Sequence, residues 1–160
     1  MTKKSVKFGN MLSCESGILV HGCNSHGVMG SGIAWSVREK YPKAFEVYHA
    51  HCENFRKNLN IPSILGDVVE CEINDDLIIM NAITQENFGR DDKMYVDYSA
   101  IYECFKKVLA TTQEKYPLLT VNYPLIGAGL GGGDWAIISD IIDTAFSEYP
   151  DISRTLWIYR

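Results

Sequence analysis

The sequence predicts a layered α/β fold, with helices packed on both faces of a central sheet. Apolar segments typical of buried strands alternate along the chain with segments in which apolar residues recur at helical spacing. The 160 residues suffice for one domain with its own core. Two of the apolar strands run directly into glycine-rich segments, the usual setting of ligand sites in open α/β sheets. We therefore expect one domain that covers residues 1–160.

Six short segments have the composition of strands, being rich in β-branched and other apolar residues. Turn-forming residues, Gly66 and Asn74-Asp75-Asp76, flank the third and fourth of them. The fifth stops at Pro124, because proline cannot donate a hydrogen bond to a neighbouring strand. The predicted strands are 5–8, 17–21, 67–71, 77–82, 119–124 and 155–159.

Four segments have the pattern of helices. In the third, Ile101, Phe105, Val108 and Leu109 fall on one face at helical spacing. Asp134 precedes the fourth apolar pattern, where an N-cap belongs. The predicted helices are 33–40, 43–57, 98–116 and 134–149, and the polar segment 85–96 is predicted to be a loop long enough to cover a site.

Charge and cysteine content narrow the function classes. The net charge of −5 argues against a bulk nucleic-acid or membrane-surface binder, which needs a basic face. Apolar stretches fall short of the roughly 20 residues of a membrane span. An odd number of scattered cysteines predicts free thiols in a reducing cytoplasm; these are Cys14, Cys23, Cys52, Cys71 and Cys104.

The two glycine-rich segments predict an anion site built from backbone amides. The first runs from His21 through Asn24, Ser25 and His26 into the helix predicted at 33–40. The second, 127–133, holds five glycines and no charged residue. Glycine lets the backbone approach a ligand, and a helix start presents free N–H groups to an anion. Neither segment has the Gly-Lys-Ser/Thr of a P-loop, and two such loops suggest a ligand with more than one phosphate.

His21 invites two interpretations. It ends a predicted strand and could carry a proton near neutral pH, or it could be a buried, hydrogen-bonded core residue. The run His49-Ala50-His51-Cys52 does not predict a metal site, because helical residues two apart face different sides. The acidic pairs 75–76 and 91–92 are typical of solvated turns. We therefore expect no metal and no cofactor.

These motifs resemble the macrodomain family, the ADP-ribose-binding α/β/α module. Val20-His21-Gly22-Cys23-Asn24 matches the strand that ends Val-Asn-Ala-Ala-Asn in many macrodomains, and Gly9-Asn10-Met11 matches their Gly-Asp-Ile turn. The segment 126–133 matches their second phosphate loop. The resemblance implies a three-layer fold with a central mixed, mostly parallel six-stranded sheet, and a monomer that binds ADP-ribose or ADP-ribose 1''-phosphate.

A longer ungapped match is to the ADP-ribose 1''-phosphate phosphatase branch of this family. It covers three segments: 19–24, 27–34 and 41–44. The activity implied is hydrolysis of the 1''-phosphate to give ADP-ribose. Two alternatives remain: a non-catalytic ADP-ribose-binding module, and a hydrolase that removes ADP-ribose from protein or nucleic acid. Against the latter, Ala34 and Gly131 stand where such hydrolases carry aspartates, and 81–85 contains no lysine.

The resemblance also assigns roles to residues. It implies catalytic roles for His21, Asn24 and Asp134, with His21 as an acid or a water-orienting group at the 1''-phosphate. Asn10 would contact the adenine end, and Asn24 the distal ribose. The implied ligand-binding residues are Gly9, Asn10, Met11, Cys23, Asn24, Gly30, Ser31, Gly32, Ile33, Ala34, Ile126, Gly127, Ala128, Gly129, Leu130, Gly131, Gly132 and Gly133.

Overall fold

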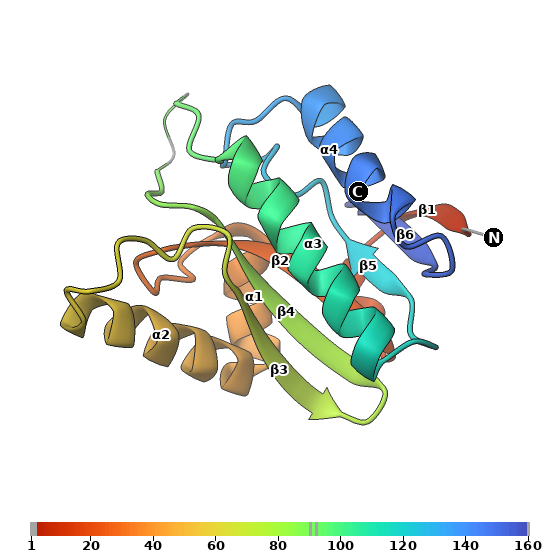
Figure 1. Cartoon of the computed structure of the whole chain (residues 1–160), viewed down its shortest axis with the longest axis horizontal. Coiled ribbons are helices and arrows are strands. Elements are labelled where there is room, and N and C mark those ends of the chain that lie inside the picture. The colour runs from red at the N-terminus through yellow and green to blue at the C-terminus, as the bar shows by residue number, and fades with distance from the viewer. Residues whose placement is uncertain (1–2, 90, 92, 160) are drawn as a thin grey trace.

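A six-stranded sheet forms the middle layer of the computed structural model, which describes residues 3–89, 91 and 93–159 (Figure 1). The strand order is β1-β6-β5-β2-β4-β3. All neighbouring strands are parallel except β3 and β4, which are antiparallel. The predicted mixed, mostly parallel sheet is therefore confirmed. Its strands are β1 Lys4–Phe8, β2 Gly17–Asn24, β3 Val68–Asn74, β4 Leu77–Gln85, β5 Val121–Tyr123 and β6 Arg154–Ile158.

Helices cover both faces of the sheet, as the alternating pattern predicted. On one face α3 (Tyr98–Lys115) and α4 (Trp135–Ser147) lie side by side (Figure 1). On the other face lie α1 (Gly32–Lys40) and α2 (Pro42–Lys57). The sequence did not predict the short 3-10 helix η1 (Met11–Ser13), which begins where the Asn10 side chain accepts a hydrogen bond from the Leu12 amide at 2.9 Å.

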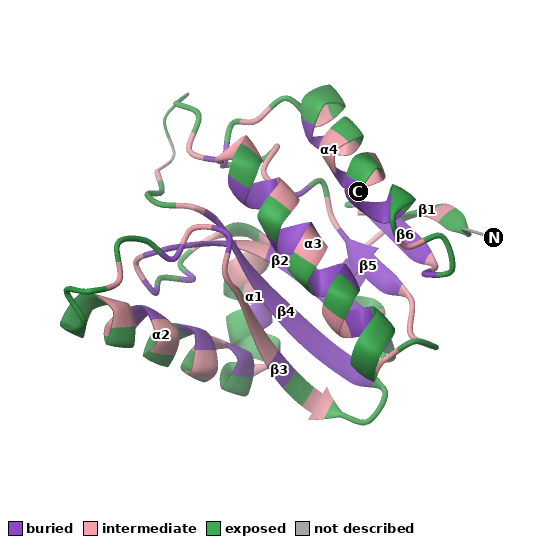
Figure 2. Cartoon of the chain, in the orientation of Figure 1, coloured by how far each residue is buried: buried purple, intermediate pink, exposed green. Residues whose placement is uncertain are grey.

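The core is centred on β2 and β4, which are purple along almost their whole length in Figure 2. Successive side chains of β2 enter different clusters: Ile18 and Val20 pack under α3 and α4, whereas Leu19 packs with residues of α1 and α2. Burial on both faces explains why these strands are continuous apolar runs rather than alternating ones. None of the described helices is long and apolar enough to cross a membrane.

The strand boundaries differ from the sequence prediction. β2 and β3 continue three residues beyond their predicted ends at residues 21 and 71, whereas β1 and β6 begin only one residue earlier than predicted. β4 continues three residues beyond the predicted 77–82, because Ile83 and Thr84 still pair or pack as strand residues and only Gln85 approaches the surface. β5 is shorter than the predicted 119–124. It starts only at Val121, because the Leu119 amide is engaged in a turn with the Tyr116 carbonyl at 3.0 Å.

A buried polar cluster joins β2, β4 and α2. His21 is 0% exposed, and its Nε2 lies 2.6 Å from Asn81 Oδ1. The Asn81 side-chain nitrogen donates to the Ala44 carbonyl at 3.2 Å and to the Val69 carbonyl at 3.0 Å. Because the Asn81 oxygen is thereby the acceptor, His21 donates through Nε2.

His21 therefore takes the second of the two roles considered above, that of a core residue. Burial lowers its pKa from 6.5 to about 4, although the hydrogen bond with Asn81 opposes the shift. The His21 ring is neutral at pH 7 and lies in the core beside Asn81, without contact with solvent. This position does not fit the catalytic role that the resemblance implies, because an acid must reach the atom that it protonates.

Replacing Phe105 by alanine is expected to destabilise the fold by about 3–5 kcal/mol. The Phe105 ring is fully buried and lies 5.5 Å from the Tyr123 ring and 6.2 Å from the Phe146 ring, between centroids. Urea unfolding would measure the loss. Leu118→Ala, at a side chain 96% exposed, should change the stability by less than about 0.5 kcal/mol. Equal effects of the two substitutions would contradict this packing.

The buried neutral ring of His21 also predicts a pH dependence of stability. Its pKa is about 4 in the folded chain and 6.5 without burial, so between these values the unfolded state binds more protons. The free energy of unfolding should fall by about 3 kcal/mol from this group as the pH decreases from 7 to 4. In His21→Gln this contribution is absent, so the difference in unfolding free energy between the two proteins should change by about 3 kcal/mol between pH 7 and pH 4. A difference that stays constant with pH would contradict the burial.

Candidate functional site

A cavity of about 960 Å³ opens along the carboxyl ends of the strands. It extends from the β1 and β6 side of the sheet, across β5 and β2, to the end of β4. This is the expected position of a ligand site in an open α/β sheet. The lining residues are Gly9–Met11, Gly22–Asn24, Val28, Gly30–Ala34, Ser36, Thr84, Gln85, Phe88, Gly89, Pro124–Gly131, Trp157 and Tyr159.

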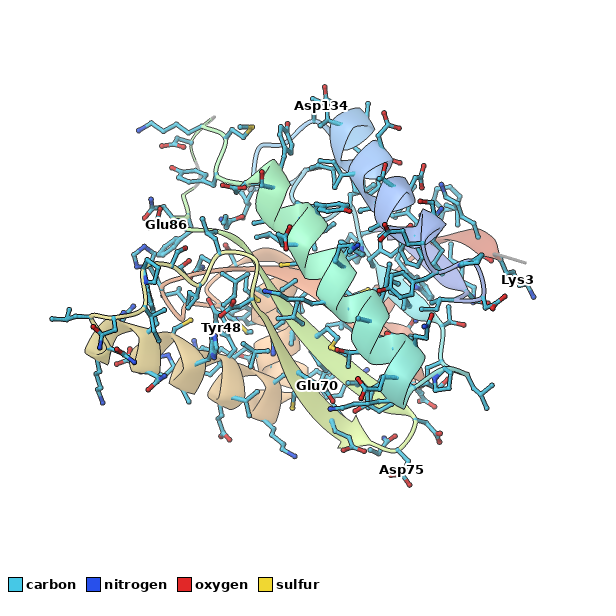
Figure 3. All side chains as sticks on the ribbon, viewed as in Figure 1. Lys3, Tyr48, Glu70, Asp75, Glu86 and Asp134 are labelled. Atoms are coloured by element: carbon cyan, nitrogen blue, oxygen red, sulfur yellow. The ribbon has the colours of Figure 1, made fainter. Side chains whose placement is uncertain are left out.

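Asn24 shapes the first glycine-rich loop. Its side-chain nitrogen donates to the Val28 carbonyl at 2.9 Å, and its Oδ1 accepts from the His26 amide at 2.9 Å. From α2, the Tyr48 hydroxyl donates to the Asn24 carbonyl at 2.6 Å (Figure 3 labels Tyr48). Asn24 is therefore held in the cavity wall mainly by contacts within the loop and with α2.

The amino-terminal end of α1 opens into the cavity without a cap. Ser31 occupies the N-cap position in extended conformation, and its side chain makes no capping hydrogen bond. The first turn closes when the Trp35 amide donates to the Ser31 carbonyl at 3.3 Å. The amides of residues 32–34 precede this bond and have no acceptor among the described residues. Together with the helix dipole they favour an anion at this end of the helix.

The second loop presents further unpaired amides. The Gly133 amide donates to the Gly127 carbonyl at 2.8 Å, and the Gly132 amide donates to the Gly129 carbonyl at 3.0 Å. These bonds turn the loop back on itself. Within the described residues, four amides of the loop have no acceptor, and all four belong to cavity-lining residues: Gly127, Gly129, Leu130 and Gly131.

Gly127 cannot be replaced without moving its neighbours. Its φ of 79° is in the left-handed region, and a Cβ there would lie 2.8 Å from Val96 Cγ2. Val96 belongs to the segment that ties down the loop, since the Tyr95 and Val96 amides both donate to the Gly131 carbonyl, at 2.7 and 3.0 Å. The loop is thus fixed before any ligand arrives.

None of the described lining residues is Asp, Glu, Lys, Arg or His. The Cys23 thiol is in the lining, but burial raises its pKa well above the usual value, so it stays protonated and is a poor nucleophile. Within the described chain, which omits Asp92, no group of three His, Cys, Asp or Glu side chains is placed to hold a metal ion. Anion binding in this cavity therefore depends on main-chain amides.

The cavity brings together all of the predicted ligand-binding residues except two. Gly132 and Gly133 lie outside the lining, because their amides close the loop internally. Asp134 also lies outside it, at the exposed start of α4 in Figure 3, where its Oδ1 accepts from the Ala136 amide at 2.9 Å. Its predicted N-cap position is confirmed, and this cap explains the residue without a catalytic role.

Sequence reasoning did not name the individual lining residues at the two ends of the cavity, although it predicted that the loop 85–96 could cover a site. At one end lie the residues that follow the predicted end of β4: Thr84, Gln85, Phe88 and Gly89. At the other end lie Trp157 and Tyr159, from and just after β6. The strand order places these strand ends at the same edge as the glycine loops, and it could not be read from the chain. The other missed residues, Gly22, Val28, Ser36, Pro124 and Leu125, adjoin predicted ones.

Comparison with known proteins gives, among others, relatives named for two different activities. The chain is 27% identical over 151 residues to a DNA ADP-ribosyl glycohydrolase of Mycobacterium tuberculosis; the match covers 93% of this chain and 40% of that protein. It is 26% identical over 145 residues to an ADP-ribose 1''-phosphate phosphatase of Candida albicans, covering 88% of this chain and 86% of the relative. The chain thus spans about 40% of the length of the mycobacterial relative and most of the fungal one.

Solved structures share the fold. The macrodomain of Mycobacterium tuberculosis DarG superposes with a TM-score of 0.81 at 22% identity, over 98% of both chains. The Macro domain family model matches residues 20–142, which include the carboxyl-terminal part of β2, all of β4, both glycine loops and most of α4. The amide-lined cavity lies at the carboxyl edge of the mixed six-stranded sheet. This chain belongs to the Macro domain family.

Proposed function

We propose that the cavity binds ADP-ribose. The observation that carries this proposal is the pair of uncapped amide groups, from the start of α1 and from the second loop, in a cavity whose described lining residues have no charged side chain. Such amides suit a diphosphate, which they can surround without lysine or arginine. Family membership supports the choice of ligand.

The resemblance to macrodomains supports a direction for the proposed ligand along the edge of the sheet. The adenosine end lies at Gly9–Met11, beside β1 and β6, where Trp157 and Tyr159 offer aromatic surface. The diphosphate lies between the two loops, and the distal ribose lies towards Asn24 and the end of β4. The strands from β1 to β4 are separated by four spacings, about 19 Å, which gives an extended nucleotide sugar room along the edge.

We further propose that the cavity hydrolyses ADP-ribose 1''-phosphate. A water molecule adds to phosphorus, the bond from phosphorus to the oxygen on C1'' breaks, and ADP-ribose and inorganic phosphate leave. The match to the phosphatase branch and to the fungal relative supports this reaction. Since the described lining has no titratable acid or base at neutral pH, the amides stabilise the phosphate charge and the leaving oxygen takes its proton from the phosphate or from solvent.

Ligand binding without turnover is the second candidate. The same lack of a titratable lining group favours it, because general acid–base catalysis typically contributes about 10²–10⁴-fold to a rate. A phosphatase of this construction is therefore expected to be slow.

Calorimetry with ADP-ribose, followed by phosphate release from ADP-ribose 1''-phosphate, separates these candidates. The proposed reaction predicts binding and slow, stoichiometric phosphate release in a single turnover with protein in excess. Binding without phosphate release above the protein-free rate would leave the binding module as the function. Absence of ADP-ribose binding would contradict both candidates.

Ser31→Asp is expected to weaken ADP-ribose binding by about tenfold or more, because it places a negative charge beside the diphosphate. The fold should tolerate it, since aspartate is as good an N-cap as serine and favours a helix start. Ser31→Asn is the matched control, with nearly the same size and no charge. Calorimetry and thermal unfolding of both variants check the prediction, and equal affinities for the two would contradict it.

A further inference from the structure

The buried hydroxyl of Thr84 is the feature of the cavity that the fold does not explain. Thr84 is 0% exposed, and its Oγ1 has no hydrogen-bond partner among the residues that the structure describes. Among the described buried side chains only one other polar atom, Arg154 Nε, is in this position. The Arg154 guanidinium forms an ion pair through a different nitrogen, since its Nη1 lies 2.8 Å from Asp143 Oδ1. Neither of these two residues lines the cavity. A buried hydroxyl without a partner destabilises a fold.

The local backbone sets Thr84 apart from the rest of β4. Cys23 of β2 pairs with Ile83, and the next residue, Asn24, pairs with Gln85, so Thr84 is the extra residue of a bulge. Bulges re-aim a side chain and are frequent beside functional sites. Here the bulge lies at the carboxyl edge of the sheet, where Thr84 and Gln85 form the β4 end of the cavity.

Gly22 lies next to the Thr84 hydroxyl in the lining of the cavity. A Cβ at this position would lie 2.9 Å from Thr84 Oγ1 and 3.2 Å from Ile126 Cγ1, so any larger residue would wedge between them. Gly22 belongs to β2, Thr84 belongs to β4 and Ile126 follows β5 by three residues; all three line the cavity. Because Gly22 has no side chain, no Cβ covers Thr84 Oγ1 at this position, and a small shift of the Ile126 side chain would open the hydroxyl to a ligand oxygen.

We propose that the Thr84 hydroxyl recognises the distal sugar of the ligand, so that it determines the preference for ADP-ribose over ADP. This inference rests on the proposed function and on the ligand direction given above, in which the distal ribose points towards β4. A sugar hydroxyl, directly or through one ordered water, completes the hydrogen bond that neither the protein nor bulk solvent supplies. The fold thus retains an unfavourable buried hydroxyl for ligand recognition.

Calorimetry with ADP-ribose and with ADP, which lacks the distal ribose, tests the inference. Thr84→Val keeps the shape of the side chain and removes the hydroxyl. It is expected to lower the affinity for ADP-ribose by about tenfold and to leave the affinity for ADP within about twofold. Thr84→Ser keeps the hydroxyl and should retain the preference. Thr112→Val is the matched control, a buried threonine on α3 outside the cavity lining.

Thermal unfolding adds an independent readout. Thr84→Val should unfold at or above the temperature of the unmodified chain, because it removes a buried hydroxyl without a partner. The ratio of the two dissociation constants does not depend on the folded fraction, so it remains informative if a variant is less stable. An unchanged ratio in Thr84→Val, or an equal loss of ADP and ADP-ribose binding, would overturn the inference. Failure of the unmodified chain to bind ADP-ribose would instead overturn the proposed function.

Discussion

Burial of β2 on both faces is the constraint on which the rest of the structure depends. The strand pairs with β4 on one side and β5 on the other, and helices cover both of its faces. A polar residue there must be neutral and hydrogen-bonded. His21 meets this condition through Asn81, and Asn24 meets it through its own loop and Tyr48. β2 can therefore place polar residues in and near the cavity although none of its side chains is charged at neutral pH.

The same constraint accounts for the character of the cavity. Its floor consists of strand ends that are already buried, so negative ligand groups must be met by groups that carry no net charge. Unpaired amides do this, because each bears a partial positive charge and needs no counter-ion. The chain as a whole has a net charge of −5. Attraction of a diphosphate is thus local, confined to the start of α1 and the second loop.

The sequence predicted the layers, the helices and most of the cavity wall, because these depend on local patterns. Apolar runs identified β2 and β4, helical spacing identified α3, and glycine content identified both loops. The end of β4 was placed too early, at residue 82, since no turn residue marks the bulge at Thr84. The role of His21 depended on which face of the strand was open, and that follows from the packing of α2 rather than from neighbouring residues.

The unpaired amides of the second loop determine how this site can be studied by mutation. Alanine scanning detects the loss of side-chain atoms, and here the donors that face the cavity belong to the main chain. An alanine scan would therefore leave most of the cavity lining unchanged and would detect only the contribution of its few polar side chains. Substitutions that add atoms are the informative ones, because at glycines such as Gly129, with open space around the Cβ position, a larger residue can fill the site without disturbing the fold.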